Sequence, residues 1–71
     1  MSAKRNEFTL ESFFEYFCDY VSRKGRQRRI VWALVGNSLQ QFTRPEKIPE
    51  RIIISIEGRD FIRYGGTVIE R

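Results

Sequence analysis

The sequence of 71 residues contains no histidine and one cysteine, Cys18. One cysteine cannot form an internal disulfide, and one cysteine without histidine cannot assemble an ordinary zinc site. Cys18 also falls on the apolar stripe of an expected helix, where its thiol would be buried and inert. Because the serines have no obvious base nearby in the sequence, no nucleophile is set up for catalysis. We therefore expect a protein that is not an enzyme and has no catalytic residues, metal site or cofactor.

Long apolar runs are also missing from the chain. No stretch approaches the roughly 20 apolar residues that a membrane-spanning helix needs. Residues 1–6 lead into a charged amphipathic segment and do not resemble the core of a signal peptide. These absences predict a cytoplasmic protein with no membrane partner.

Acidic residues are absent between Asp19 and Glu46, where the chain carries six lysines and arginines. Five of these six lie in the run from Arg23 to Arg29. The formal net charge of the whole chain is +4, so the positive charge is concentrated in one block. Such a block attracts phosphate backbones or acidic protein surfaces, whatever the fold around it.

An amphipathic helix is predicted over residues 9–24. Its apolar positions follow helical spacing and form one stripe, which comprises Leu10, Phe13, Phe14, Phe17, Cys18 and Val21. Thr9 can cap the first turn, and Gly25 can supply the left-handed residue that ends the helix. Glu11, Glu15 and Asp19 would form an acidic ridge on the solvent side, either merely solvated or available to a partner.

A second helix is predicted over residues 27–42, because Val31, Leu34, Val35, Leu39 and Phe42 also keep helical spacing. The β-branched and aromatic run at residues 30–32 leaves an alternative open, in which residues 28–36 form a strand and a short helix follows this strand. Trp32 and the phenylalanines are expected in the core. Two prolines then make an extended connector of residues 43–49.

Short strands are predicted after the connector. Residues 52–56 form a β-branched run, residues 57–60 offer a turn, and residues 61–64 can return as the partner strand, with a third strand at 67–69. The predicted fold class is therefore α+β, with two N-terminal helices followed by a C-terminal β-hairpin or three short antiparallel strands. We expect one domain over residues 1–71, flexible at residues 1–7.

The candidate binding residues follow from the basic block. At the corner between the two expected helices, several guanidinium groups could contact neighbouring phosphates or carboxylates. Amide side chains on the second helix could read base edges. The candidate set for a nucleic acid or an acidic partner is Arg23, Lys24, Arg26, Arg28, Arg29, Gln40, Gln41 and Arg44. A solvated surface loop is the alternative interpretation of the same charges.

Two stretches carry resemblances to DNA-binding families. Residues 48–51 (Ile-Pro-Glu-Arg) and the hairpin-like residues 52–58 resemble small phage repressors of the Cro type, over about a third of the chain. Residues 54–62 resemble the end of winged-helix domains, which would make residues 56–64 helical. Both resemblances imply DNA binding and a bacterial cell or phage-infected host.

The expected function is a small basic transcription-regulatory protein, a homodimer in our interpretation, that binds DNA through the arginine-rich interhelical segment. The alternative is a non-catalytic protein-binding module, such as a phage-encoded factor that modulates host RNA polymerase or another host enzyme. A third possibility is an oligomer built through an exposed strand edge at residues 52–56.

Overall fold

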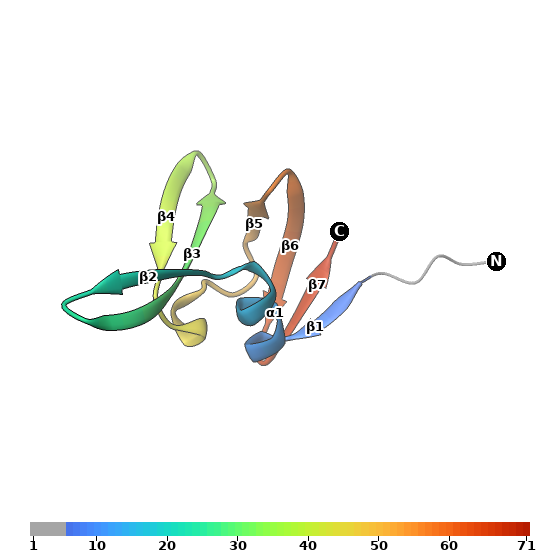
Figure 1. Cartoon of the computed structure of the whole chain (residues 1–71). Coiled ribbons are helices and arrows are strands. Elements are labelled where there is room, and N and C mark those ends of the chain that lie inside the picture. Colours follow the sequence, from blue (N-terminus) through green and yellow to red (C-terminus); the bar gives the residue numbers. More distant parts are fainter. Residues whose placement is uncertain (1–5) are drawn as a thin grey trace.

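The computed structural model describes residues 6–71, and over this range the chain is mostly β-structure (Figure 1). One short helix, one 3-10 turn and seven strands follow in chain order: β1 Glu7–Thr9, α1 Leu10–Phe17, β2 Asp19–Arg23, β3 Arg26–Val35, β4 Ser38–Phe42, η1 Pro45–Lys47, β5 Ile53–Ile56, β6 Arg59–Tyr64 and β7 Thr67–Glu70. The predicted α+β fold with two N-terminal helices is therefore wrong. The expectation of flexibility for residues 1–7 falls mainly on residues 1–5, outside the described residues, whereas Glu7 already belongs to β1.

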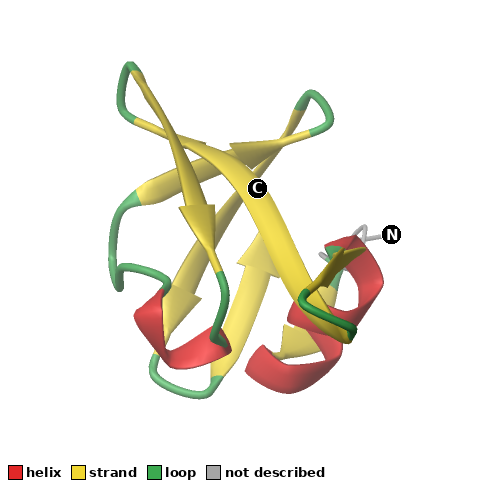
Figure 2. Cartoon of the chain, turned by 60° about the vertical axis from the view of Figure 1, so that its left-hand side comes forward, coloured by secondary structure: helices red, strands yellow, loops and turns green. Residues whose placement is uncertain are grey.

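All neighbouring strands are antiparallel, in the order β1-β7-β6-β5-β3-β2, with β4 also paired to β3. Strand β3 is the longest, and it pairs with β2 through residues 26–30 and with β4 through residues 31–35. Figure 2 shows α1 and the 3-10 turn at one end of the strands, and the turns of the β3–β4 and β5–β6 hairpins at the other. The β2–β3 hairpin extends sideways from this body (Figure 1).

The helix α1 begins where the sequence predicts and ends seven residues early. The Thr9 side chain accepts a hydrogen bond from the Ser12 amide at 3.1 Å, which caps the first turn. The helix ends at Phe17 because Cys18 has extended backbone angles. From Asp19 onward the chain pairs with β3, so the tertiary pairing overrides the helical pattern at Val21.

The predicted second helix is the β3–β4 hairpin. Val31, Ala33 and Val35 face the core with the two-residue period of a strand, and Gly36, at φ 64°, begins the turn into β4. The strand alternative for residues 28–36 is correct in this part of the chain. The short helix expected after it is absent, because Ser38–Phe42 pairs with β3 instead.

The chain after the connector folds as three antiparallel strands, β5 to β7, so residues 56–64 are not helical. Strand β5 lies between β3 and β6. On its β3 side only Ile54 and Ser55 are paired, so the edge expected at residues 52–56 is occupied at its centre, and oligomerisation through it stays a prediction.

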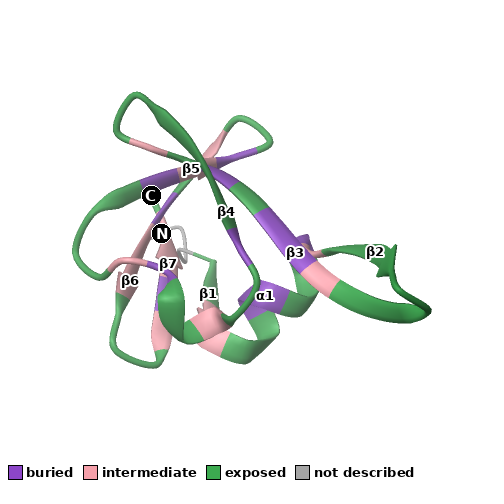
Figure 3. Cartoon of the chain, turned by 90° about the vertical axis from the view of Figure 1, so that its left-hand side faces the viewer, coloured by how far each residue is buried: buried purple, intermediate pink, exposed green. Residues whose placement is uncertain are grey.

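An aromatic cluster forms the centre of the core, where α1 packs against the sheet. Figure 3 shows buried positions on α1 and on the strands of the body. The fully buried Phe61 ring on β6 contacts the rings of Phe8, Phe13 and Phe17, with centroid distances of 4.9 to 6.2 Å and mostly edge-to-face geometry. Aliphatic residues of β3, β5, β7 and the connector complete the core: Val31, Ala33, Ile48, Ile54, Ile56 and Val68. Among residues 6–71, no helix has the length and apolar character that a membrane crossing requires.

Replacing the central ring tests this core. We expect Phe61→Ala to lower the free energy of unfolding by about 3–5 kcal/mol, because a buried ring is lost and a cavity remains. A domain of this size has roughly that much stability in total, so the variant should be largely unfolded. Urea unfolding followed by circular dichroism measures the effect. Ile53→Ala, at a side chain 38% exposed on β5, is the control and should cost much less; equal losses would contradict this core.

Arg59, at the start of β6, and Glu70, at the end of β7, form a bidentate ion pair. The guanidinium donates from Nε and Nη2 to the two carboxylate oxygens at 2.9 and 2.8 Å, and the Asn6 amide donates to Glu70 Oε1 at 2.7 Å. Arg59, and secondarily Asn6, lower the pKa of Glu70 from 4.5 to about 2. This contact therefore holds β7 to the start of β6.

The depressed pKa predicts a pH dependence of stability. Because the Glu70 pKa is lower in the folded chain than in the unfolded one, its contribution is complete above about pH 4.5 and is lost as the pH falls toward 2. We expect Glu70→Gln to remove this part of the acid destabilisation, measured as urea midpoints between pH 6 and pH 2. Glu57→Gln, in the β5–β6 turn, is the control and should keep it. A Glu70→Gln profile parallel to the wild type would refute the prediction.

Candidate nucleic-acid interface

The basic block forms the tip of the β2–β3 hairpin, where the sequence predicts an interhelical corner. Arg23 lies opposite Arg26, and Lys24 and Gly25 form the two-residue turn between them. Both turn residues have positive φ, 51° for Lys24 and 74° for Gly25, as in the type I′ turn that suits the twist of a hairpin. Glycine adopts this conformation without strain, so Gly25 favours the turn at this point.

Three arginines share one face of the hairpin. Residues directly opposite each other in an antiparallel pair point to the same side, so Arg23 and Arg26 lie together. Arg28, two residues along β3, lies on that side opposite Val21. With Lys24, these arginines line an open hollow of about 510 Å³. Four cationic side chains therefore converge on one concave surface, which we call the basic hollow (Arg23, Lys24, Arg26 and Arg28).

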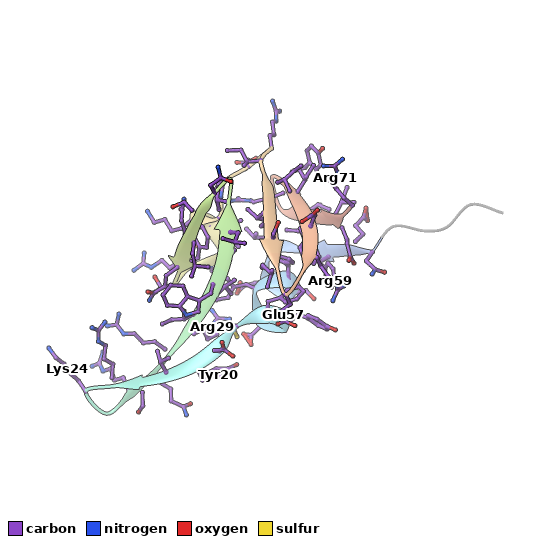
Figure 4. The ribbon with its side chains drawn as sticks, turned by 90° about the horizontal axis from the view of Figure 1, so that it is seen from above. Tyr20, Lys24, Arg29, Glu57, Arg59 and Arg71 are labelled. Carbon is purple, nitrogen blue, oxygen red and sulfur yellow. The ribbon has the colours of Figure 1, made fainter. Side chains whose placement is uncertain are left out.

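The basic hollow is exposed and its charges are not neutralised within the described part of the chain. Every residue of β2, and Arg26 to Arg28 of β3, is exposed (Figure 3). Lys24 lies at the outermost end of the hairpin (Figure 4). Among the cationic side chains of residues 6–71, only Arg29 and Arg59 form salt bridges. The field of the hollow is thus directed at solvent.

Arg29 differs from the other basic residues because it anchors the hairpin to α1. Its guanidinium forms an ion pair with Glu15, lies 3.8 Å from a Glu11 oxygen, and sits over the Phe14 ring at 5.2 Å from the centroid. Arg29, and then the Tyr20 hydroxyl that donates to Glu15 at 3.0 Å, lower the pKa of Glu15. The structure therefore separates Arg29 from the binding set and gives it a structural contact.

The acidic ridge predicted on the first helix does not form as one surface. Glu11 and Glu15 lie on α1 beside Arg29, whereas Asp19 belongs to β2. Cys18 is half-buried, and its Sγ donates to the Glu15 carbonyl at 3.5 Å. Within residues 6–71 no group of three histidine, cysteine or acidic side chains is placed to hold a metal ion.

The remaining candidates lie away from the hollow. Gln40 and Gln41 are neighbours on β4, so they point to opposite faces of the sheet and cannot act together as they would on a helix. Gln41 lies opposite Trp32, and Gln40 opposite Ala33. Arg44 is exposed just before the 3-10 turn. Of these three residues, only Gln41 lies next to an exposed aromatic side chain, that of Trp32.

Trp32 is the residue that the sequence interpretation missed. It was expected in the core, but it is 48% exposed on β3. The signal was the alternation of Val31, Ala33 and Val35, which leaves Trp32 on the opposite face once the segment is a strand.

Comparison of the chain with protein-family models, with curated proteins and with solved structures finds no match. The resemblances to Cro-type repressors and winged-helix domains therefore stay predictions.

The exposed hairpin should open more readily than the body. Ile30 is the one buried side chain of the hairpin residues 19–30, and two paired strands without a core are marginally stable in water. We expect the amides of Arg23 and Arg26 to exchange with solvent deuterium far faster than those of Ile54 and Phe61, as measured by NMR. Equal protection of the two groups would contradict this prediction.

Proposed function

We propose that this protein is a small, non-catalytic nucleic-acid-binding protein that acts in transcription regulation and contacts DNA through the β2–β3 hairpin. The observation that carries the proposal is the basic hollow: Arg23, Lys24, Arg26 and Arg28 converge on one exposed surface with no acidic partner among the described residues. Arginine forks and the lysine ammonium suit the oxygens of consecutive phosphates. Releasing the counterions of those phosphates supplies the affinity.

The same structure disfavours a partner bound through acidic and basic surfaces together. That alternative needs the Glu11–Glu15–Asp19 ridge to be available, and two of its members are occupied by Arg29. An acidic protein surface, such as one on RNA polymerase, would then have to be recognised by the hollow alone. Binding of that kind is the alternative outcome of the experiment below.

Salt dependence and charge reversal test the proposal. We expect single-stranded and duplex DNA 20-mers to bind with dissociation constants on the order of 10⁻⁶ to 10⁻⁴ M at physiological salt. The logarithm of affinity should fall linearly with the logarithm of salt concentration, and Arg26→Ala should reduce that slope by about one unit. Fluorescence anisotropy of labelled DNA measures both quantities.

A matched pair of variants separates the hollow from total charge. Arg26→Glu and Arg71→Glu each lower the formal net charge of +4 by two, but Arg71 lies at the end of the molecule away from Lys24 (Figure 4). We expect Arg26→Glu to weaken binding at least tenfold and Arg71→Glu to change it little. Equal effects of both variants, or no binding of the wild type to either DNA, would refute the proposed function. In the latter case a partner retained after nuclease treatment of a lysate would favour the acidic protein surface.

A further inference from the structure

The strand that carries the arginines also carries an exposed apolar surface on the body. Trp32 is 48% exposed and Leu34 45% exposed on β3, and Leu39, opposite Leu34 on β4, is 62% exposed. In a small soluble domain a tryptophan normally contributes to the core, because burying it stabilises the fold substantially. We call Trp32, Leu34 and Leu39 the apolar platform.

The platform and the basic hollow lie along one face of β3. Side chains alternate along a strand, and Val31 and Ala33 point into the core, so Trp32 and Leu34 point outward. The same two-residue period places Arg26 and Arg28 on the outward side. Ile30, between Arg28 and Trp32 on that side, is buried but lies outside the main core cluster. Four residues of strand separate Arg28 from Trp32, which is about 13 Å.

From these positions we infer that Trp32 stacks on an unpaired base, so that the nucleic acid bound by the protein is single-stranded where it crosses β3. The inference rests on the proposed function, because the phosphates of the same strand would be held by Arg26 and Arg28. A flat indole beside arginines is the combination that binds single strands without sequence preference.

Charge favours a polyanion as the occupant of the platform. The chain has no acidic residue between Asp19 and Glu46, which covers most of β2 and all of β3 and β4. The phosphates flanking a base on Trp32 would therefore meet positive side chains and no carboxylate of these strands. Gln41, directly opposite Trp32, has an amide that can both donate to and accept from a base edge.

A duplex does not use this surface as well as a single strand does. In a duplex the bases are stacked on each other and present only their edges in the grooves. A tryptophan on a sheet face then finds no ring to stack on, and only the arginine contacts to phosphate remain. Single-stranded nucleic acid should thus gain affinity from Trp32, and duplex should not.

Trp32 is the only tryptophan of the chain, so fluorescence excited selectively at tryptophan reports on this position alone. The experiment titrates the full-length protein with three probes of equal length: oligo(dT), oligo(U) and duplex DNA. Each titration is followed by tryptophan quenching and by anisotropy of the labelled probe. We expect quenching by the single strands, saturating at the same concentration as the anisotropy, and about tenfold tighter binding of single strand than of duplex. The oligo(dT) and oligo(U) arms show whether the bound strand is DNA or RNA.

Variants of the platform distinguish stacking from other roles. Trp32→Ala should weaken single-strand binding about tenfold and leave duplex binding within twofold, and Trp32→Phe should recover most of the loss. Ile52→Ala, at an apolar side chain 47% exposed outside the platform, is the control and should leave both affinities unchanged. Urea unfolding and circular dichroism confirm that each variant is folded.

Three further outcomes overturn the inference in different ways. If single strand and duplex bind equally and Trp32→Ala changes neither, the stacking inference fails while the proposed function stands. If Trp32→Ala leaves both affinities unchanged and instead abolishes self-association in sedimentation experiments, the platform is a protein contact and the inference fails. Absence of binding to all three probes would remove the proposed function together with the inference.

Discussion

Strand β3 runs from the body of the protein into the projecting hairpin without interruption, and Arg29 holds the junction. Beyond this point the hairpin has no core of its own, because β2 is exposed along its whole length. The Arg29 guanidinium, placed between the Glu15 carboxylate and the Phe14 ring, joins the hairpin to α1, which covers the core. The position of the four outer cations relative to the body depends on this contact.

Because of this contact, the basic residues of a single run have two different roles. Arg29 is drawn to carboxylates of the same chain, whereas the side chains nearer the turn have no such partner among the described residues. The two kinds of arginine differ only by their position on the strand: Arg28 points away from α1, and Arg29 points toward it. Inspection of the charge pattern alone assigns all of them to one role.

Part of the fold could be predicted from the sequence, because local chemistry determined it. Thr9 marks the start of α1, and the β-branched residues 52–56 and the glycines after them mark the C-terminal strands. The segment 27–42 was misassigned because Val31, Leu34, Val35, Leu39 and Phe42 satisfy a helical period by coincidence. Only the pairing of β3 with β2, β4 and β5, which is not visible locally, decides between helix and strand. Trp32 is exposed because this segment is a strand, so the prediction of a helix there also missed the exposure of Trp32.

The type I′ geometry at the hairpin tip occurs a second time in the molecule, with the opposite charge. Glu57 and Gly58, between β5 and β6, have φ of 53° and 76°, close to the values of Lys24 and Gly25. The preferred first residue of such a turn is asparagine or aspartate, because other side chains are strained there. Since the same backbone accepts either a lysine or a glutamate, folding does not require the positive charge of Lys24. The turn thus leaves the sign of the charge at each tip open, and an asparagine at residue 24 would relax the backbone while removing the outermost cation of the β2–β3 hairpin.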